Sequence, residues 1–354
     1  MVKRQTGPAD SGARPSLHHL KAATVTHDDP QTAHEAYSPT SHDPTILAFR
    51  YAPWITTPGI YLDMSDVEYH LDPVVGGSVS SSLLRKMIPP RGTARHGLHY
   101  MQAKREEKDY FDQGSAFHTG ILGTGKTIVE VEEKSWQTKA AISARRAAYA
   151  RGAVPLLTKE CELVAAMVKA TLDDSECAEL FTPGTFTAEL VIVWQDPATG
   201  IWCRAKIDAI PDYSRHLRVV DAKTVAGDAA PDRVCQFIEQ FGVHQQLAFY
   251  MTGVGALIAL GLLEPAETIS GFLVAVGKDA PHVPLARPVD DESIEIGRVQ
   301  IRKALDVYAT AMDTGIWPGY ADPKHTPVGL PHWAKTRFEY QHNNEHIYDV
   351  EDLF

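Results

Sequence analysis

Three carboxylates and a lysine lie close together in residues 187–224, a stretch otherwise rich in the residues of buried strands. They are Glu189, Asp208, Asp221 and Lys223, with Ala222 alone between the last two. A buried charge without a partner is energetically costly, so acidic side chains among Val and Ile residues need a reason. A divalent metal ion would supply one, because Mg²⁺ is held by carboxylate and carbonyl oxygens.

Metal-assisted hydrolysis of a phosphodiester is the chemistry that matches these residue types. The reaction needs a positioned, partly deprotonated water, and it needs the charge on the phosphoryl oxygens to be neutralised. We expect Asp208, Asp221 and the backbone carbonyl of Ala222 to hold Mg²⁺, with Mn²⁺ as a substitute. Lys223 would activate the water or stabilise the transition state, and Glu189 would be a further ligand or position the water. The D-x-K tripeptide is a weak motif by itself, because it occurs by chance in many chains.

A sheet is needed to bring these side chains together. Residues 189–194, 201–210 and 217–224 are rich in Val, Ile and alternating apolar residues, and polar turns such as 196–200 separate them. Turn residues between β-branched runs are typical of an antiparallel meander. We therefore predict three consecutive antiparallel strands.

The alternation of strand side chains decides which of these residues face each other. Residues two apart project to the same side, so Asp221 and Lys223 point together, and Asp208 shares a side with Arg204 and Lys206. This parity leaves a purely structural alternative open, in which the two aspartates form salt bridges with Arg204 or Lys206.

A long helical stretch, residues 234–263, follows the strands, and we expect it to break near Gly242. Gln246 and Tyr250 stand four residues apart within it and share a helical face. We identify both as candidate site residues. An acid, an acid and D-x-K on successive strands, followed by Q-xxx-Y on the next helix, is a much more specific pattern than D-x-K alone.

Two earlier stretches also carry candidates. Residues 116–122 form an apolar helix with His118, which is either a core histidine or, if it reaches the carboxylates, a metal ligand. Residues 136–172 are predicted to be helical with a basic face that is either solvated or in contact with a DNA backbone. The candidate DNA-binding residues are Lys139, Arg145 and Arg146.

The remaining elements frame this region. We expect a short helix at 83–88 that stops at the following prolines, a buried strand at 268–277 and an amphipathic helix at 293–314. The inward-facing residues of that last helix are predicted to be Ile294, Ile301, Leu305, Tyr308 and Met312.

Composition sets the broad class. The chain has 354 residues, of which 44% are hydrophobic and 22% charged, and its formal net charge is −11. This charge argues mildly against a passive nucleic-acid coat but not against a nuclease, since local basic patches decide binding. No run reaches the length of a membrane span, the start has no apolar segment typical of a secretory signal, and four cysteines without a CxxC favour a reducing cytosol. Residues 1–45 read as a disordered tail, and 46–354 as a single domain.

Taken together, the motifs resemble the PD-(D/E)XK nuclease superfamily. Over about residues 55–340 the chain is most similar to the nuclease domain of RecE-type exonucleases, the exonuclease VIII group of phage and prophage recombination loci. The resemblance implies an α/β fold with a mixed central sheet flanked by helices. It also makes His118 a metal ligand, Glu189 the strand acid, Asp208 the central metal-binding acid, and Asp221 with Lys223 the D-x-K pair. Gln246 and Tyr250 match the Gln and Tyr of the helix that follows.

The resemblance further implies a function and partners. Enzymes of this type resect linear double-stranded DNA from 5′ ends and leave a 3′ overhang, onto which a RecT-type single-strand annealing protein loads. It implies a ring-like homo-oligomer that threads DNA, in the cytoplasm of a bacterial host and without a membrane partner.

Three other interpretations remain open. An iron–sulfur nuclease of the helicase–nuclease or CRISPR-adaptation type would need a cysteine trio downstream, but no cysteine follows Cys235. A nuclease of the same fold could act as an endonuclease or with the other polarity. A non-catalytic DNA-binding protein is disfavoured because every expected catalytic residue type is present.

Overall fold

The computed structural model describes residues 53–62, 64–103, 109–211, 215–320 and 328–344. Contacts divide the chain into two units, Met1–Trp317 and Pro318–Phe354. The second unit carries helix α12 (His332–Asn344). The predicted tail at 1–45 lies outside the described residues, and the assignment of 46–354 to one domain stays a prediction.

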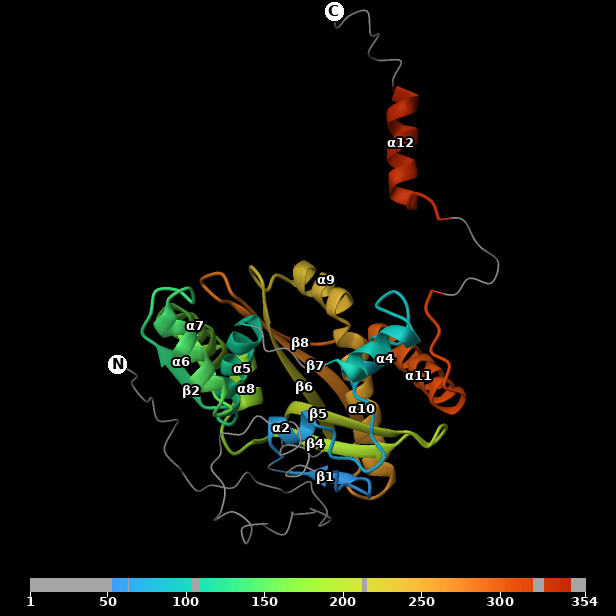
Figure 1. Cartoon of the computed structure of the whole chain (residues 1–354), viewed down its shortest axis with the longest axis horizontal. Helices are drawn as coiled ribbons and strands as arrows, with labels where there is room; N and C mark the ends of the chain where they lie inside the picture. The colour runs from blue at the N-terminus through green and yellow to red at the C-terminus, as the bar shows by residue number, and fades with distance from the viewer. Residues whose placement is uncertain (1–52, 63, 104–108, 212–214, 321–327, 345–354) are drawn as a thin grey trace, which may run out of the picture. The chain divides into compact units, whose positions relative to one another are not determined.

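A six-stranded mixed sheet forms the centre of the first unit (Figure 1). All neighbouring strands are antiparallel except β6 and β7, which run parallel. In spatial order the strands are β1 (Gly59–Tyr61), β4 (Phe186–Gln195), β5 (Trp202–Pro211), β6 (His216–Val225), β7 (Thr268–Gly277) and β8 (Pro284–Pro288). The predicted meander is therefore β4, β5 and β6, and the predicted strand at 268–277 is β7. The α/β fold with a mixed sheet is confirmed.

Helices cover both faces of this sheet. On one face α10 (Val243–Ala259), α11 (Asp291–Thr314) and the short α3 (Ser81–Leu84) pack against side chains such as Val219 and Leu273. The other face packs residues such as Val220, Ala222 and Val274 against helices that come earlier in the chain. These helices are α5 (Asp109–Leu122), α7 (Thr158–Asp173) and α8 (Ser175–Phe181). Burial on both faces explains why the central strands are apolar almost throughout.

Smaller elements complete the described part of the chain. A second, two-stranded parallel sheet joins β2 (Ile128–Val131) to β3 (Val154–Leu157). The remaining helices are α2 (Asp66–His70), α4 (Ala94–Gln102), α6 (Lys139–Tyr149) and α9 (Pro231–Phe241). Within the described residues, no helix combines the length and the apolar character that crossing a membrane requires.

The prediction of continuous helix over 136–172 is wrong. The structure has α6, then strand β3, then α7 in this stretch. Gly152 adopts φ +67°, a conformation that glycine reaches without a steric penalty. The four residues of β3 that follow are fully buried against β2. Tertiary pairing of this short apolar run therefore overrides its helical spacing.

Two details of other helices also differ from prediction. The helix expected over 83–88 is limited to α3, with turns continuing up to the prolines. In α11, Ile294, Ile301 and Leu305 are buried as expected and Tyr308 is half-buried against the same core, whereas Met312 is exposed because Ala311 is the residue of that turn that faces the core.

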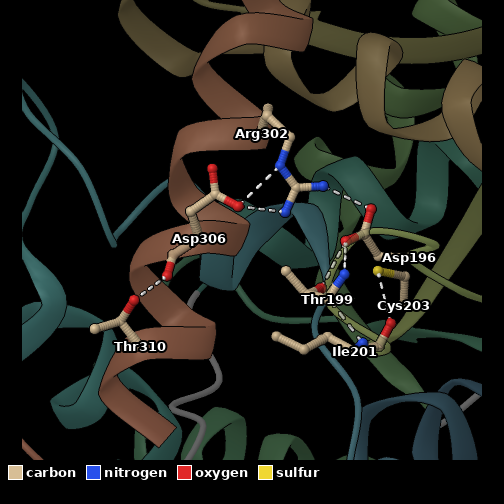
Figure 2. Close-up of polar contacts among 7 residues, drawn as sticks. All are labelled: Asp196, Thr199, Ile201, Cys203, Arg302, Asp306 and Thr310. Carbon is tan, nitrogen blue, oxygen red and sulfur yellow. Dashed lines mark hydrogen bonds and ion pairs between the residues drawn. The ribbon is translucent and has the colours of Figure 1, made fainter. Parts of the chain in front are cut away.

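The turn between β4 and β5 is tied to α11 by a group of ion pairs (Figure 2). One oxygen of Asp196, Oδ2, accepts hydrogen bonds from the backbone N–H and the hydroxyl of Thr199, at 3.0 and 2.6 Å. The other, Oδ1, accepts from Nη1 of Arg302 at 2.7 Å, and the same guanidinium pairs with Asp306 at 2.7 Å. This cluster connects two distant elements, and each of its charges has a partner.

Candidate active site

Asp221 and Lys223 lie in the middle of β6 and face α10. They share the parity of Leu217 and Val219, whose side chains pack in the core on the α10 side of the sheet. Asp221 is fully buried, and its Oδ2 lies 2.5 Å from Nζ of Lys223. The predicted common orientation of the D-x-K pair is therefore what the structure shows.

Gln246 and Tyr250 approach the same carboxylate from α10. The amide Nε2 of Gln246 donates to Oδ1 of Asp221 and to the hydroxyl oxygen of Tyr250, both at 2.8 Å. These two bonds use both hydrogens of the amide. Because its amide is held in this way, Gln246 fixes the orientation of the Asp221 carboxylate.

Gly242 sets where α10 begins and thus where Gln246 lies. It separates α9 from α10 with φ +66°. A Cβ at this position would come within 2.7 Å of Oε1 of Gln245 and 2.9 Å of Cδ of Arg85. Only glycine meets both constraints without rearrangement, so the predicted break near Gly242 is also what places Gln246 one turn into the helix.

The backbone N–H and carbonyl oxygen of Ala222 connect Asp208 and His118 to the pair Asp221 and Lys223. Its N–H donates to Oδ2 of Asp208 at 2.8 Å. Its carbonyl oxygen accepts from Nε2 of His118 at 2.8 Å and from Nζ of Lys223 at 3.3 Å. Nε2 of His118 is also 3.7 Å from Oδ2 of Asp208. Since a carbonyl oxygen only accepts, Nε2 carries the proton of the His118 ring in this arrangement.

The opening between β5 and β6 is what makes these contacts possible. The register between these two strands consists of the pair Ala209–Val220 in the described part of the chain. Beyond it the strands separate, and the Asp208 carboxylate takes the place that a strand carbonyl would otherwise occupy opposite the Ala222 N–H. The Asp208 carboxylate therefore bonds directly to the backbone of the central strand β6.

Glu189 lies opposite Asp208 across β4 and β5, between the pairs Ala188–Ala209 and Leu190–Ile207. Its backbone has φ +49°, which is unusual for a residue other than glycine. Its Oε2 pairs with Nζ of Lys206 at 2.9 Å. Glu189 is thus adjacent to the other acids along the sheet, but the partner that the structure gives it is a lysine.

The structural alternative, in which Arg204 and Lys206 neutralise the central aspartates, does not match the contacts. Arg204 pairs with Asp72 at 2.9 Å, and Lys206 pairs with Asp66 as well as Glu189. Both basic residues therefore take their acidic partners from elsewhere in the chain.

Burial makes the Asp221 charge costly. Desolvation raises the pKa of this carboxyl, the neighbouring Asp208 raises it further, and Lys223 offsets only part of the effect. Oδ2 of Asp221 is buried and has no hydrogen bond, although it is ion-paired with Lys223. Burial also raises the pKa of Tyr250, which keeps its hydroxyl neutral.

These donors fit a small divalent cation. Two aspartates and a backbone carbonyl are hard oxygen ligands of the kind that Mg²⁺ prefers, and Lys223 offsets only part of the cost of burying the Asp221 charge, so a bound cation would stabilise it further. Within the described residues, no three His, Cys, Asp or Glu side chains lie close enough together to hold a metal by themselves. The set therefore depends on the Ala222 carbonyl, and His118 could bind the cation through Nε2 only as the tautomer that carries its proton on Nδ1.

A family model of a "PDDEXK-like domain of unknown function (DUF3799)" matches residues 80–324, more than half of the chain. The chain belongs to this family. The matched range contains every candidate site residue, and nucleases with the PD-(D/E)XK fold generally use divalent metal ions. The membership expected from the motifs is confirmed, and the protein carries a PD-(D/E)XK nuclease-like domain.

Two further comparisons complete the picture. No curated protein sequence matches the chain. Among solved structures, the chain is similar to the crystal structure of a "putative exonuclease" from Eubacterium rectale, with 13% identity and a TM-score of 0.49. The similarity covers 76% of this chain and 96% of that one. At this level we draw no functional argument from it.

The predicted DNA-binding residues of the PDDEXK-like domain lie on α6. Lys139 and Arg146 are exposed. The guanidinium of Arg145 lies over the rings of Trp136 and Tyr149, at 5.1 and 5.7 Å from their centroids. Arg145 thus makes cation–π contacts with neighbouring aromatic side chains of the same chain. A contact of α6 with DNA stays a prediction.

Asp66, which shares Lys206 with Glu189, has no local signal in the sequence. Asp66 begins α2 and reaches Lys206 across 140 positions of sequence. Burial alone would lower the pKa of Lys206, but the charges of Asp66 and Glu189 outweigh it and raise the pKa. Parity placed Lys206 on the side of Asp208, yet no local pattern identifies Asp66 as its partner.

Proposed function

We propose that this protein is a Mg²⁺-dependent deoxyribonuclease that degrades linear double-stranded DNA from its ends. The observation that carries the proposal is the joining of Asp208, Asp221 and Lys223 through the Ala222 peptide in a PDDEXK-like domain. A salt-bridge network alone would not need an acid that bonds to a strand N–H, or a fully buried carboxylate whose charge its lysine offsets only in part.

Asp208, Asp221 and the Ala222 carbonyl would hold the cation. When bound, Mg²⁺ neutralises phosphoryl oxygens and lowers the pKa of a coordinated water. Gln246 keeps the Asp221 carboxylate in one orientation, because its amide is itself fixed by Tyr250. A site held in this way needs little reorganisation before reaction.

Lys223 is the residue we assign to the attacking water. Its Nζ reaches both Oδ2 of Asp221 and the Ala222 carbonyl oxygen. An ammonium group between two proposed ligand atoms can orient a water, accept its proton after losing its own, or stabilise the pentavalent transition state. Glu189, opposite Asp208, is proposed as the further acid that helps to position this water.

The finer features of the proposal rest on the resemblance to RecE-type exonucleases. They are 5′ to 3′ polarity, production of 3′ overhangs for recombination, a RecT-type annealing partner, a ring-like homo-oligomer, a phage or prophage origin and a cytoplasmic location. Mn²⁺ is expected to replace Mg²⁺. His118 is proposed as an additional metal ligand through Nε2, with its ring proton on Nδ1.

The test is incubation with linear duplex DNA labelled at the 5′ or the 3′ end, with Mg²⁺ or with EDTA. We expect Mg²⁺-dependent release of labelled mononucleotide from the 5′ end first, and no reaction in EDTA. A circular duplex of the same sequence is the matched substrate control and should persist.

Each contrary result has a definite meaning. Cutting of the circle would identify an endonuclease, and early release of the 3′ label would reverse the polarity. Equal activity of the wild type and Lys223→Ala would remove the site assignment. Absence of any cleavage by the wild type with Mg²⁺ and with Mn²⁺ would overturn the proposed function.

A further inference from the structure

A second charged network is centred on Lys206, two residues before Asp208 on β5. Nζ of Lys206 pairs with Oε2 of Glu189 at 2.9 Å and with Oδ1 of Asp66. Nζ of Lys126 lies 3.7 Å from the other oxygen of Asp66. The Lys206 side chain is only 12% exposed, so two carboxylates share one ammonium group that is largely removed from solvent.

Two carboxylates, those of Asp66 and Glu189, bind Lys206. Glu189 does so from a backbone conformation that disfavours non-glycine residues. Strained residues of this kind persist where the surrounding structure holds them, and they concentrate at functional sites.

The position of Glu189 next to Asp208 offers a functional reason for its unfavourable backbone conformation. Glu189 and Asp208 lie on the adjacent strands β4 and β5 between the pairs Ala188–Ala209 and Leu190–Ile207, and Lys206 precedes Asp208 by two residues on β5. Asp208 in turn contacts the Ala222 N–H. Lys206 therefore binds Glu189 at the edge of the proposed metal and water site.

We propose that Lys206 is a positioning residue, which Asp66 anchors and which holds the Glu189 carboxylate beside Asp208 for its part in the reaction. The inference rests on the proposed nuclease function and goes beyond it. It assigns a role to two residues, Asp66 and Lys206, that the D-x-K pattern does not include.

Arg204 offers a matched control for the structural contribution of such an ion pair. It lies two residues before Lys206 on β5 and is similarly buried, at 11% exposed. It binds Asp72 and the Tyr69 carbonyl, just as Lys206 binds Asp66, so both connect β5 to the α2 region. Arg204 pairs with Asp72, whereas Glu189 pairs with Lys206, so replacing Arg204 removes an ion pair between β5 and the α2 region without removing the one that positions Glu189.

The experiment compares Lys206→Met, Lys206→Arg and Arg204→Met with the wild type as full-length chains. Cleavage of linear duplex DNA gives kcat and KM, calorimetric titration with Mn²⁺ alone gives metal affinity, and thermal unfolding gives stability. We expect Lys206→Met to lower kcat about 10- to 100-fold and to weaken Mn²⁺ binding about 10-fold, the range typical of residues that orient metal-site groups. KM for DNA should stay unchanged.

The other two variants separate positioning from stability. Lys206→Arg should retain kcat within about threefold, because it keeps a cation between the two carboxylates. Arg204→Met should lose stability but retain both kcat and Mn²⁺ affinity. If Lys206→Met keeps the kcat and Mn²⁺ affinity of Arg204→Met, the inference is overturned, while the nuclease proposal stands.

A double-variant cycle covers the case in which Lys206→Met fails to fold. Asp66→Asn leaves Lys206 with Glu189 but removes its anchor, so kcat should fall in the same direction by a smaller factor. In a Glu189→Gln background, Asp66→Asn should lower kcat no further, since the group to be positioned is gone. Additive losses would overturn the inference. A wild type that neither cleaves DNA nor binds Mn²⁺ would overturn the function as well.

Discussion

Asp196 and Asp221 are both buried, but their surroundings shift the pKa of the carboxyl group in opposite directions. Both oxygens of Asp196 are bonded, to Thr199 and to Arg302 (Figure 2). Burial opposes its ionisation, but these bonds outweigh burial and lower the pKa. Asp221 has Oδ1 bonded to Gln246 and Oδ2 ion-paired with Lys223, yet burial outweighs these contacts and raises its pKa.

This difference in pKa shift indicates that ionised Asp196 stabilises the fold, whereas ionised Asp221 destabilises it. A fully bonded charge such as Asp196 holds a turn against a helix. A buried carboxylate whose charge is only partly compensated lowers stability in the absence of a ligand and is suited to bind a cation. The contrast supports the placement of the active site at Asp221, and it can be tested from both sides.

The largest effect should follow from removing Lys223. We expect Lys223→Ala to lower the rate of DNA cleavage roughly 10²- to 10⁴-fold, the usual contribution of a positioned acid–base group, with little loss of stability. Rates are measured on linear duplex DNA at saturating Mg²⁺. Arg302→Ala is the control and should cleave within about twofold of the wild type under conditions where it is folded.

Arg302→Ala should be the more damaging change for stability. It leaves the Asp196 charge buried without its cation, which costs about 1–3 kcal/mol for a lost hydrogen bond to a charged group. Urea unfolding followed by circular dichroism measures the free energy of unfolding. An unchanged midpoint would mean that Thr199 alone is sufficient to hold Asp196.

Asp221→Asn should act in the opposite direction. The raised pKa means that the folded state favours the neutral form, so ionised Asp221 lowers stability at neutral pH. Without divalent metal we expect a gain of about 1 kcal/mol, in the range found when functional residues are replaced, measured by thermal unfolding in EDTA. Asp196→Asn is the matched change and should lose stability. A loss in both variants would show that Asp221 is a structural residue.

The pH dependence of the Asp196 contribution is the finest test of the comparison. The folded pKa of Asp196 lies below the unfolded one, so its contribution to stability is present above the unfolded pKa. That contribution disappears as pH falls through the folded value. The stability difference between wild type and Asp196→Asn should therefore be constant near neutrality, begin to shrink below about pH 4, and reach its low-pH limit only below the folded pKa. A difference that persists at lower pH would contradict this assignment.

Local periodicity accounts for what the sequence predicted about the site. Alternation placed Asp221 and Lys223 together, and helical spacing placed Gln246 and Tyr250 together, because both depend only on near neighbours. The opening of β5 from β6, which lets Asp208 bond to the Ala222 N–H, depends on how two strands diverge and left no such pattern.

Long-range partners account for the rest. Asp66 meets Lys206 across 140 positions, and nothing near either residue indicates the other. The missed strand β3 has the same cause, because its burial against β2 outweighed local helical spacing. Sequence thus predicted which candidate residues face each other better than it predicted which residues hold them in place.

The span of these contacts has a consequence for a chain still on the ribosome. His118 reaches the Ala222 carbonyl across 104 positions, and Gln246 follows Asp221 by 25. A nascent chain that has emerged only as far as β6 already carries its acids and its lysine, yet it lacks the amide that orients Asp221. Activity would therefore begin only after α10 has left the exit tunnel and docked, so incomplete translation products would be inert.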